Sequence, residues 1–294
     1  GLSQTKYSMW ATVVANILNV ILNYVLIYGI WIFPEMGIIG AGLGTLISRV
    51  IMAILMYVLI YKKEKFSLYF QDLWQEKIVK KTILKVNKLG LPSALQMFFE
   101  FGVFTAAIWL AGTLGKNPQA ANQIALNLAS ITFMFAMGLG VVATIRVGNQ
   151  FGLKDFKELR RISFSIFLLM LILDVLFAVI FMIFNEFLPS LYLDVDDPQN
   201  FIDNTEVVAI AAKLMIIAAF FQLFDGMQAV ILGALKGMQD VFIPTIITFI
   251  AYWIVAFPIC YFAGLEFGYG SVGIWWGFLI GLVVSAGLLF WRFQ

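Results

Sequence analysis

The chain contains eight apolar stretches that are each long enough to cross a lipid bilayer. A helix rises about 1.5 Å per residue, so roughly 20 apolar residues span the ~30 Å hydrocarbon core. Of the 294 residues 62% are hydrophobic and 12% are charged, whereas about 25% are charged in a soluble domain. We therefore predict an all-α polytopic membrane protein with eight transmembrane helices. The stretches lie at 8–30, 38–61, 91–114, 120–147, 162–184, 206–235, 241–263 and 271–292.

Basic residues concentrate in alternate connections between these stretches. The connection after residue 61 is rich in lysine, the one after residue 147 contains Lys154, Lys157, Arg160 and Arg161, and the sixth connection contains Lys236. Acidic residues instead crowd the connection after residue 184. Because cytoplasmic loops carry an excess of Lys and Arg, we predict a multi-pass protein of the cell inner (plasma) membrane with both ends of the chain in the cytoplasm.

A glycine pattern near the second stretch recurs near the eighth. The two sets match at a constant offset of 233 residues: Gly37, Gly40 and Gly44 against Gly270, Gly273 and Gly277. Small residues at such spacing let membrane helices approach closely, and a repeat of this length holds six spans. We therefore assign 1–61 to the last two helices of an N-terminal bundle, 62–90 to a cytoplasmic amphipathic linker and 91–294 to a six-helix C-terminal bundle.

On this interpretation the chain, which begins with Gly1, lacks the first four helices of the N-terminal bundle. We expect these missing N-terminal helices to be partners of the bundle, alongside the lipid bilayer itself. Two interpretations of the linker remain open. It contains a helix lying on the lipid headgroups, or it joins two pseudo-equivalent halves.

Two residue types that enzymes use most are almost absent. The chain has no His and one Cys, Cys260, within an apolar stretch. This excludes Ser-His and Cys-His nucleophile pairs, thiol metal clusters and disulfide frameworks. We expect a protein that is not an enzyme and has no organic cofactor. A net charge of +2 gives no reason to expect a nucleic-acid partner.

Two carboxylates are predicted at the same depth in the membrane. Glu100 lies about ten residues into the third stretch, which corresponds to ~15 Å. Asp225 lies eleven residues before Lys236 in the opposite-running sixth stretch, which corresponds to ~16 Å. A buried carboxyl costs a few kcal/mol, so we predict that the pair is functional; a purely structural, hydrogen-bonded role is the alternative.

Polar and aromatic residues at helical spacing surround both acids and predict a shared cavity. Such a cavity attracts a proton, a small cation or an amphipathic organic cation, because opposite charge, cation–π attraction and apolar burial act together. Asp174 lies in the middle of the fifth stretch without a polar companion, and its role stays open between functional and structural. The candidate lining residues are Gln96, Gln123, Asn127, Gln222, Gln228, Phe221, Phe224 and Asp174.

Several motifs in order along the chain resemble one family of transporters. They are NILN at 16–19, LNY at 22–24, PEMGIIGA at 34–41, LGLP at 89–92 followed by Glu100, AANQIA at 120–125, IRVGN at 145–149, FD at 224–225 and GALKGMQD at 233–240. Together they resemble the multidrug and toxic compound extrusion (MATE) family, in its NorM-like branch. The resemblance implies two six-helix bundles in an inverted V, of which this chain would hold spans five to twelve.

The resemblance also implies a function and a site. Members of this family export cationic or amphipathic compounds in exchange for H⁺ or Na⁺. Glu100 and Asp225 match the acids that bind the coupling cation, and they would be the metal ligands if that cation is Na⁺. Some relatives have a Tyr one turn before the second acid, where this chain has Phe221. The missing hydroxyl favours protons slightly over sodium ions.

Two other functions remain open. A flippase for lipid-linked oligosaccharides would share the bundle architecture, but it would be expected to line its cavity with Arg or Lys side chains for a pyrophosphate. An intramembrane enzyme of the aspartyl type would use Glu100 and Asp225 as its catalytic dyad. Cleavage of labelled peptides would identify such an enzyme.

Overall fold

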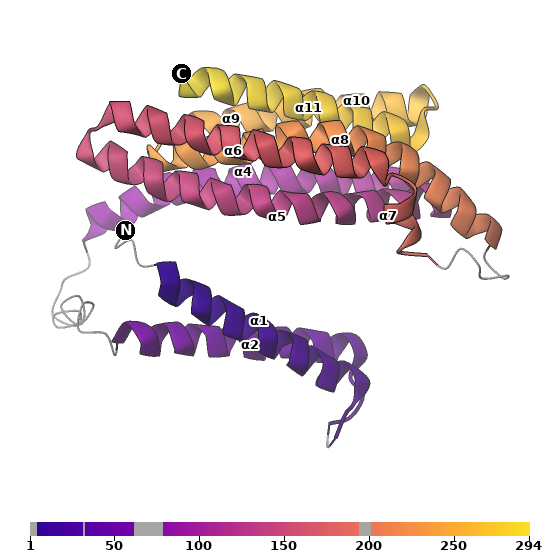
Figure 1. Cartoon of the computed structure of the whole chain (residues 1–294), viewed down its shortest axis with the longest axis horizontal. Helices are drawn as coiled ribbons and strands as arrows, with labels where there is room; N and C mark the ends of the chain where they lie inside the picture. Colours follow the sequence, from indigo (N-terminus) through magenta and orange to yellow (C-terminus); the bar gives the residue numbers. More distant parts are fainter. Residues whose placement is uncertain (1–4, 32, 62–78, 194–200) are drawn as a thin grey trace. The chain divides into compact units, whose positions relative to one another are not determined.

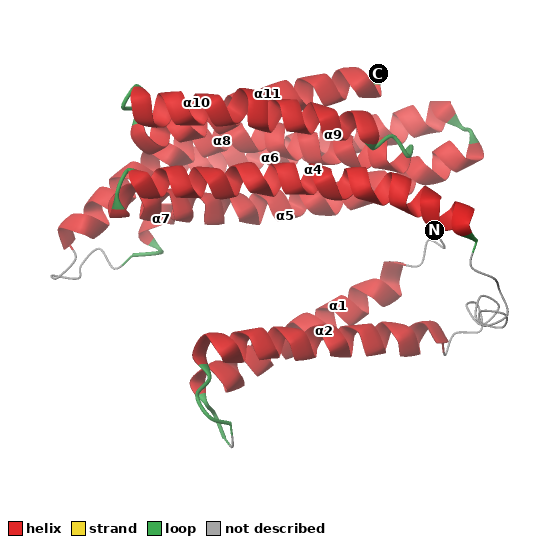
Figure 2. Ribbon diagram, turned by 180° about the vertical axis from the view of Figure 1, so that it is seen from behind, coloured by secondary structure: helices red, strands yellow, loops and turns green. Residues whose placement is uncertain are grey.

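The computed structural model describes residues 5–31, 33–61, 79–193 and 201–294. In these ranges the regular elements are helices and no residue is assigned to a strand (Figure 2). Eight helical segments are long and apolar enough to cross a membrane, which confirms the predicted eight-span architecture. The backbone contacts divide the chain into two units, Gly1–Lys80 and Lys81–Gln294. Of the predicted linker 62–90, residues 62–78 lie outside the described ranges and Lys80 begins the next helix.

The first unit consists of α1 (Thr5–Tyr28) and α2 (Gly37–Tyr61), which lie along each other (Figure 1). Polar contacts join them within the apolar surroundings: Asn19 Nδ2 donates to Thr45 Oγ1 at 3.3 Å, and Asn23 Nδ2 donates to Asn19 Oδ1 at 3.4 Å. A Cβ on Gly44 would overlap Asn23 Oδ1. The asparagines of α1 therefore act between the two helices, the role expected of polar side chains at membrane helix interfaces.

The second unit is a bundle of six spans with α8 against several of the others (Figure 1). Five spans are single helices, and the short α7 (Phe187–Ser190) follows the third of them. The remaining span, the fifth of the bundle in chain order, is a composite of α9 (Phe242–Phe249), η1 (Ile250–Ala256), α10 (Phe257–Tyr261) and η2 (Phe262–Glu266). The single helices are α4 (Lys80–Thr113), α5 (Lys116–Leu153), α6 (Phe156–Ile183), α8 (Phe201–Gly237) and α11 (Gly270–Phe293).

Three helices continue well beyond their apolar stretches. The 34, 38 and 37 residues of α4, α5 and α8 would measure about 50–57 Å at ~1.5 Å per residue, more than the ~30 Å of hydrocarbon. The expectation that Lys236 lies in a connection is wrong, because α8 continues to Gly237. It ends there in a Schellman motif, in which Asp240 N donates to Leu235 O, Gln239 N donates to Lys236 O, and Gln239 adopts φ of 64°.

The composite span contains two π-helical segments, one on each side of Pro258. A proline within a helix has no N–H to donate and its ring crowds the carbonyl four residues earlier. Widening of the preceding turns relieves this conflict, and η1 ends at Ala256, two residues before Pro258. This π-helical segment contains Tyr252, which reaches the site described below.

Helices α5 and α8 approach each other closely through small residues. Thr144 Oγ1 donates to Gly233 O at 2.9 Å, and a Cβ on Gly233 would overlap the backbone of Gly140. One turn further along, a Cβ on Gly237 would lie 2.8 Å from Thr144 O. This close approach holds the polar face of α5 next to the acid-bearing face of α8.

The two copies of the glycine repeat have equivalent structural roles. Gly37 and Gly270 begin α2 and α11 with positive φ of 51° and 61°. The later glycines of each copy lie against the preceding span: a Cβ on Gly40 would be 2.5 Å from Leu26 O, and a Cβ on Gly277 would be 2.6 Å from Cys260 N. The sequence repeat therefore corresponds to a repeated helix-pair packing.

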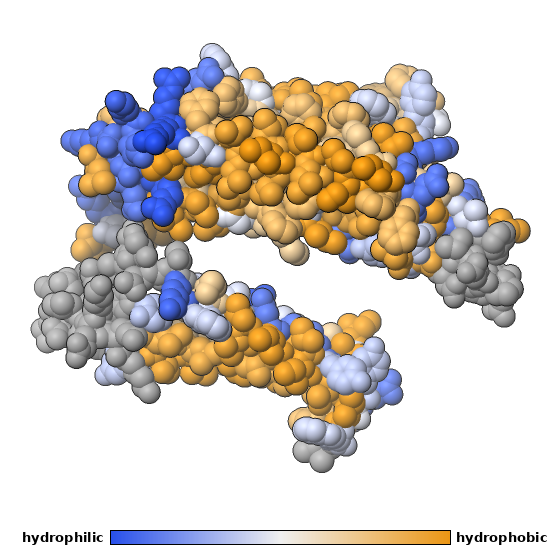
Figure 3. Space-filling view, viewed as in Figure 1, coloured by the Kyte–Doolittle hydropathy of each residue, from blue (hydrophilic) through white to orange (hydrophobic). Residues whose placement is uncertain are grey.

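On the surface of the second unit, polar residues lie mainly at the two ends of the bundle (Figure 3). Figure 3 shows an apolar band along the bundle, with the densest polar surface at the end that contains the C-terminus and the turn between α5 and α6. Lys154, Lys157, Arg160 and Arg161 belong to this turn and the start of α6. We call it the basic end of the bundle.

Candidate functional site

A cavity of about 310 Å³ lies between α4, α5 and α8 in the second unit. Both predicted acids, Glu100 and Asp225, line it. We call it the larger cavity. Its polar wall on α5 is formed by Gln123 and Asn127, both predicted as lining residues, together with Ser130. The sequence therefore located acids and amides that the tertiary structure brings to one cavity.

The carboxylate of Glu100 is held by two glutamine side chains. Its Oε2 accepts a hydrogen bond from Gln96 Nε2 at 3.2 Å, one turn earlier on α4. Its Oε1 accepts from Gln228 Nε2 of α8 at 3.3 Å. The same Gln228 nitrogen donates to the hydroxyl of Tyr252 at 2.8 Å. Three spans therefore meet at one buried carboxylate.

The backbone of α4 is fixed beside this acid by the composite span. Trp253 Nε1 donates to Phe99 O at 3.1 Å, and its ring lies against Gly102. Nearer the start of α4, Thr245 Oγ1 donates to Pro92 O at 2.8 Å. These contacts lie on both sides of Glu100 in the sequence and so position its side chain.

Asp225 is 6% exposed and lines the same cavity. None of the ion pairs or side-chain hydrogen bonds found among the described residues involves its carboxylate. A buried carboxylate without donors is costly in an apolar setting. Asp225 is therefore available to a cation or proton that enters the cavity.

Aromatic rings close the cavity on the side of α11. The centroids of Phe104 and Phe278 are 4.7 Å apart, and those of Phe221 and Trp275 are 5.4 Å apart. Phe221 is 3% exposed and offers no hydroxyl. The hydroxyl of the site comes instead from Tyr252, which sequence reasoning missed. Its signal was a phenol in the middle of an apolar span, where a polar group needs a partner.

Four predicted lining residues lie outside both the larger cavity and the smaller one described below. Gln228 bridges Glu100 and Tyr252, Phe224 packs against the core of the bundle, and Gln222 Nε2 approaches Asp174 O at 3.5 Å. Asp174 is 1% exposed, its Oδ2 has no hydrogen-bond partner among the described residues, and its carboxylate lies against Gly226. Asp174 therefore contacts Gly226, the residue after Asp225, but lines neither cavity.

A second cavity, of about 170 Å³, adjoins the first. Glu100, Phe101 and Phe133 line both cavities. The second one also includes Gln96, Thr144 and Lys236. We call it the smaller cavity; Glu100 therefore lies at the boundary between the two spaces.

Residues 92–262 match the family model described as MatE. The chain belongs to the MatE family. It is 36% identical over 299 positions to the probable multidrug resistance protein NorM of Rhizobium meliloti (strain 1021), covering 100% of this chain and 62% of that protein. It is 34% identical over 300 positions to the multidrug resistance protein NorM of Photobacterium profundum, covering 100% of this chain and 63% of the relative.

Solved structures of MATE transporters share the fold. The eukaryotic MATE transporter AtDTX14 superposes with a TM-score of 0.80 at 19% identity, over 96% of this chain and 60% of the other. A point mutant of the Vibrio cholerae MATE transporter VcmN gives 0.82 at 16% identity, over 97% and 60%. The predicted NorM-like MATE resemblance is confirmed, and the chain spans about three-fifths of these relatives.

Family membership and the eight candidate spans among the described residues identify a multi-pass membrane protein of a transporter family. Within the described ranges, no group of three or more His, Cys, Asp or Glu side chains could hold a metal ion. The candidate cation ligands in and beside the larger cavity are Glu100, Asp225 and Oε1 of Gln228. This Gln228 oxygen is buried and has no hydrogen-bond partner among the described residues. Two acids and a free amide oxygen suit a monovalent cation or a proton.

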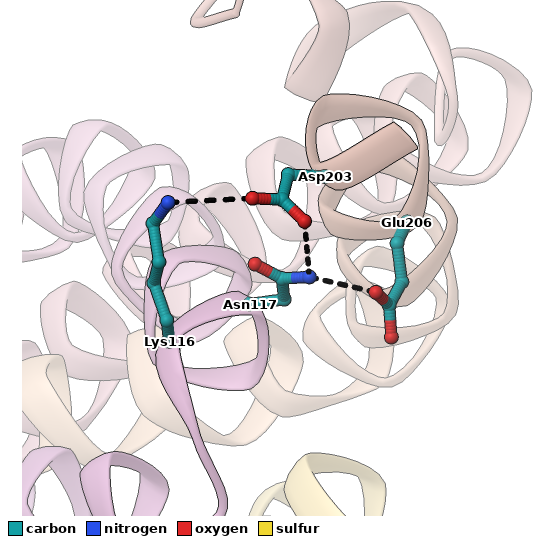
Figure 4. A network of polar contacts seen from close by, with 4 residues as sticks. All are labelled: Lys116, Asn117, Asp203 and Glu206. Atoms are coloured by element: carbon teal, nitrogen blue, oxygen red, sulfur yellow. Dashed lines mark hydrogen bonds and ion pairs between the residues drawn. The ribbon is translucent and has the colours of Figure 1, made fainter. Parts of the chain in front are cut away.

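The ends of α5 and α8 opposite the basic end are joined by a separate polar network (Figure 4). Asn117 Nδ2 donates to Asp203 Oδ1 at 3.4 Å and to Glu206 Oε2 at 2.6 Å. Lys116 Nζ lies 3.4 Å from Asp203 Oδ2. The network fixes the start of α5 against the start of α8. None of its residues lines the larger cavity.

Proposed function

We propose that the full-length protein is a secondary multidrug antiporter, which exports cationic and amphipathic compounds in exchange for H⁺ or Na⁺ by alternating access. The observation that carries the proposal is the convergence of Glu100 and Asp225, from α4 and α8, on one cavity with an aromatic wall. The names of the NorM relatives are consistent with efflux of drugs.

The chemistry of the larger cavity favours cations over anions and neutral sugars. Its charged lining side chains are the two acids, and Phe104 and Phe221 present aromatic rings next to them. A cation gains attraction from the carboxylates and from the ring faces in a site that contains little water. No basic side chain of the described residues lines this cavity, so a pyrophosphate-bearing lipid would have no positively charged partner in it.

Coupling follows if the ion and the drug need the same carboxylates. An ion bound at Glu100 and Asp225 removes the negative charge that attracts a cationic drug, and a bound drug removes the charge that attracts the ion. Each ligand therefore lowers the affinity for the other, and this effect is reciprocal. Alternating exposure of the cavity to the two sides of the membrane then exchanges one ligand for the other.

The distribution of charge supports an orientation for this cycle. The basic end of the bundle faces the cytoplasm under the positive-inside rule, and Lys236 lies in the last turn of α8 towards that end. Both ends of the chain are then cytoplasmic. In this orientation the smaller cavity, which contains Lys236, lies on the cytoplasmic side of Glu100.

Proteoliposomes that contain the full-length protein test the proposal under separately imposed sodium and pH gradients. We expect efflux of ethidium to follow one of the two gradients and to be lost in Glu100→Gln and Asp225→Asn. Glu158→Gln and Asp155→Asn are matched controls, because Asp155 is the exposed N-cap of α6, Glu158 is half-buried in its first turn, and Asn is as good an N-cap as Asp. Gradient-driven efflux that persists in both acid variants would overturn the site, and efflux that needs neither gradient would overturn antiport.

A further inference from the structure

The smaller cavity places one cationic side chain on the same space as Glu100. Of the residues that line this cavity, Glu100 is the carboxylate and Lys236 is the cation. The rest of the lining is mainly apolar, apart from Gln96 and Thr144. Opposite charges that face one cavity of about 170 Å³ interact through a medium that screens them weakly.

Lys236 has no other acidic partner among the residues that the structure describes. The ion pairs found in these ranges join Lys116 to Asp203, Arg161 to Glu158, and Arg292 to Asp240. Asp240, the nearest acid along the chain, is therefore taken by Arg292 at 2.9 Å.

The position of Lys236 suits a mobile compensating charge. It is half-buried in the last turn of α8, where the negative end of the helix dipole stabilises a cation. Its flexible four-carbon stem lets the ammonium group move within the cavity. The charged or titratable groups near this space are Glu100 on α4, Asp225 and Lys236 on α8, and Tyr252 of η1, whose hydroxyl accepts from Gln228 beside Glu100, while the α5 residues that line the cavity are uncharged.

We propose that Lys236 is an internal counter-cation for Glu100. When the coupling ion has left, the Lys236 ammonium compensates the Glu100 carboxylate across the smaller cavity. When the ion is bound, it neutralises the Glu100 carboxylate, so the ammonium is no longer attracted there and moves back towards the end of α8. Lys236 is thus a positioning residue that competes with the coupling ion for one carboxylate. This inference rests on the proposed antiport function and adds a determinant of ion affinity to it.

The test compares ion binding and transport in Lys236→Met, Lys236→Arg and Lys213→Met of the full-length protein. Lys213 lies exposed on the same helix and lines neither cavity, so it is the matched control. We expect Lys236→Met to lower the half-saturating concentration of the coupling ion, H⁺ or Na⁺, by about tenfold, because the competing charge is lost. Lys236→Arg keeps the charge and should remain near wild type, as should Lys213→Met.

A double variant separates this role from a structural one. In a Glu100→Gln background the Lys236→Met change should have no further effect on ion binding, since the carboxylate for which the charges compete is gone. Direct ion binding to the purified protein is measured beside efflux. Absence of gradient-driven efflux in the wild type would refute the proposed function alone. Equal ion affinity of Lys236→Met and wild type, or the same shift in the Glu100→Gln background, would refute the counter-cation.

Discussion

Gln228 of α8 donates a hydrogen bond from Nε2 to Oε1 of Glu100 on α4, at 3.3 Å, and so joins the two acid-bearing helices beside the cavity. The same amide nitrogen donates to Tyr252. This side chain therefore links the composite span to the proposed ion site. The link gives the first two predictions.

Gln228→Leu should weaken the fold and change ion binding at Glu100. The change keeps most of the side-chain volume. It leaves Glu100 Oε1 and the Tyr252 hydroxyl without the donor that Gln228 supplies. Leaving a buried acceptor unsatisfied lowers the free energy of unfolding by about 1–3 kcal/mol. We expect a lower thermal unfolding midpoint in detergent and, for H⁺ as the coupling ion, a lower half-saturating concentration, because the Glu100 carboxylate loses a donor that favours its charged form. Gln150→Leu, near the end of α5, is the control. Unchanged ion affinity would show that Gln228 does not support the site.

Tyr252→Phe removes one hydroxyl from the centre of the bundle. The ring stays, so packing is kept, while one of the two acceptors of Gln228 is lost. We expect a loss of about 0.5–1.5 kcal/mol in stability and a measurable change in ion affinity, because Gln228 becomes free to reorient away from Glu100. Tyr261→Phe is matched to it, since the Tyr261 hydroxyl contacts Glu266 at an exposed position. Equal effects of the two variants would contradict a role of Tyr252 in the site.

Gly226→Ala tests the packing of Asp174 against α8. A Cβ at this position would overlap the Asp174 carboxylate and lie 2.7 Å from Met170 Cε. Overpacking of this kind costs about 1–3 kcal/mol, so the thermal midpoint should fall. In the double variant Gly226→Ala/Asp174→Ala, the loss of stability caused by Gly226→Ala should be much smaller, because the overlapping carboxylate is gone. Gly138→Ala, where a Cβ meets nothing within 4 Å, should be neutral or stabilising. Strict additivity of Gly226→Ala and Asp174→Ala would argue against their contact.

Asn117→Ala should loosen the network of Figure 4 more than Lys116→Ala does. Asn117 bonds two carboxylates, Asp203 and Glu206, and its loss leaves two like charges near each other without a shared donor. We expect a loss of about 1 kcal/mol for Asn117→Ala. The side chain of Lys116 is 82% exposed, so its ion pair contributes about 0–1 kcal/mol, and less at high salt. Thermal unfolding at low and high salt measures both, and a larger loss for Lys116→Ala would contradict this ranking.

The sequence was most informative where a fixed helical geometry links position to depth. Eight apolar stretches predicted eight spans, and these are confirmed. Counting the rise per residue placed Glu100 and Asp225 at one level, and both acids line one cavity. The glycine offset of 233 residues likewise corresponds to two helix pairs packed in the same way. The roles of the two acids in ion binding stay a prediction.

Tertiary structure decided which faces of the helices meet. Asp174 is in the middle of its span, as the sequence requires, yet it lies against Gly226 and not in the larger cavity. Tyr252 and Lys236 carried no spacing signal, but a π-helical segment holds Tyr252 at the Glu100 site, and the continuation of α8 beyond its apolar stretch keeps Lys236 on the smaller cavity. Apolar length fixes where a chain crosses a membrane, whereas the rotation of each helix depends on its packing against neighbours distant in sequence.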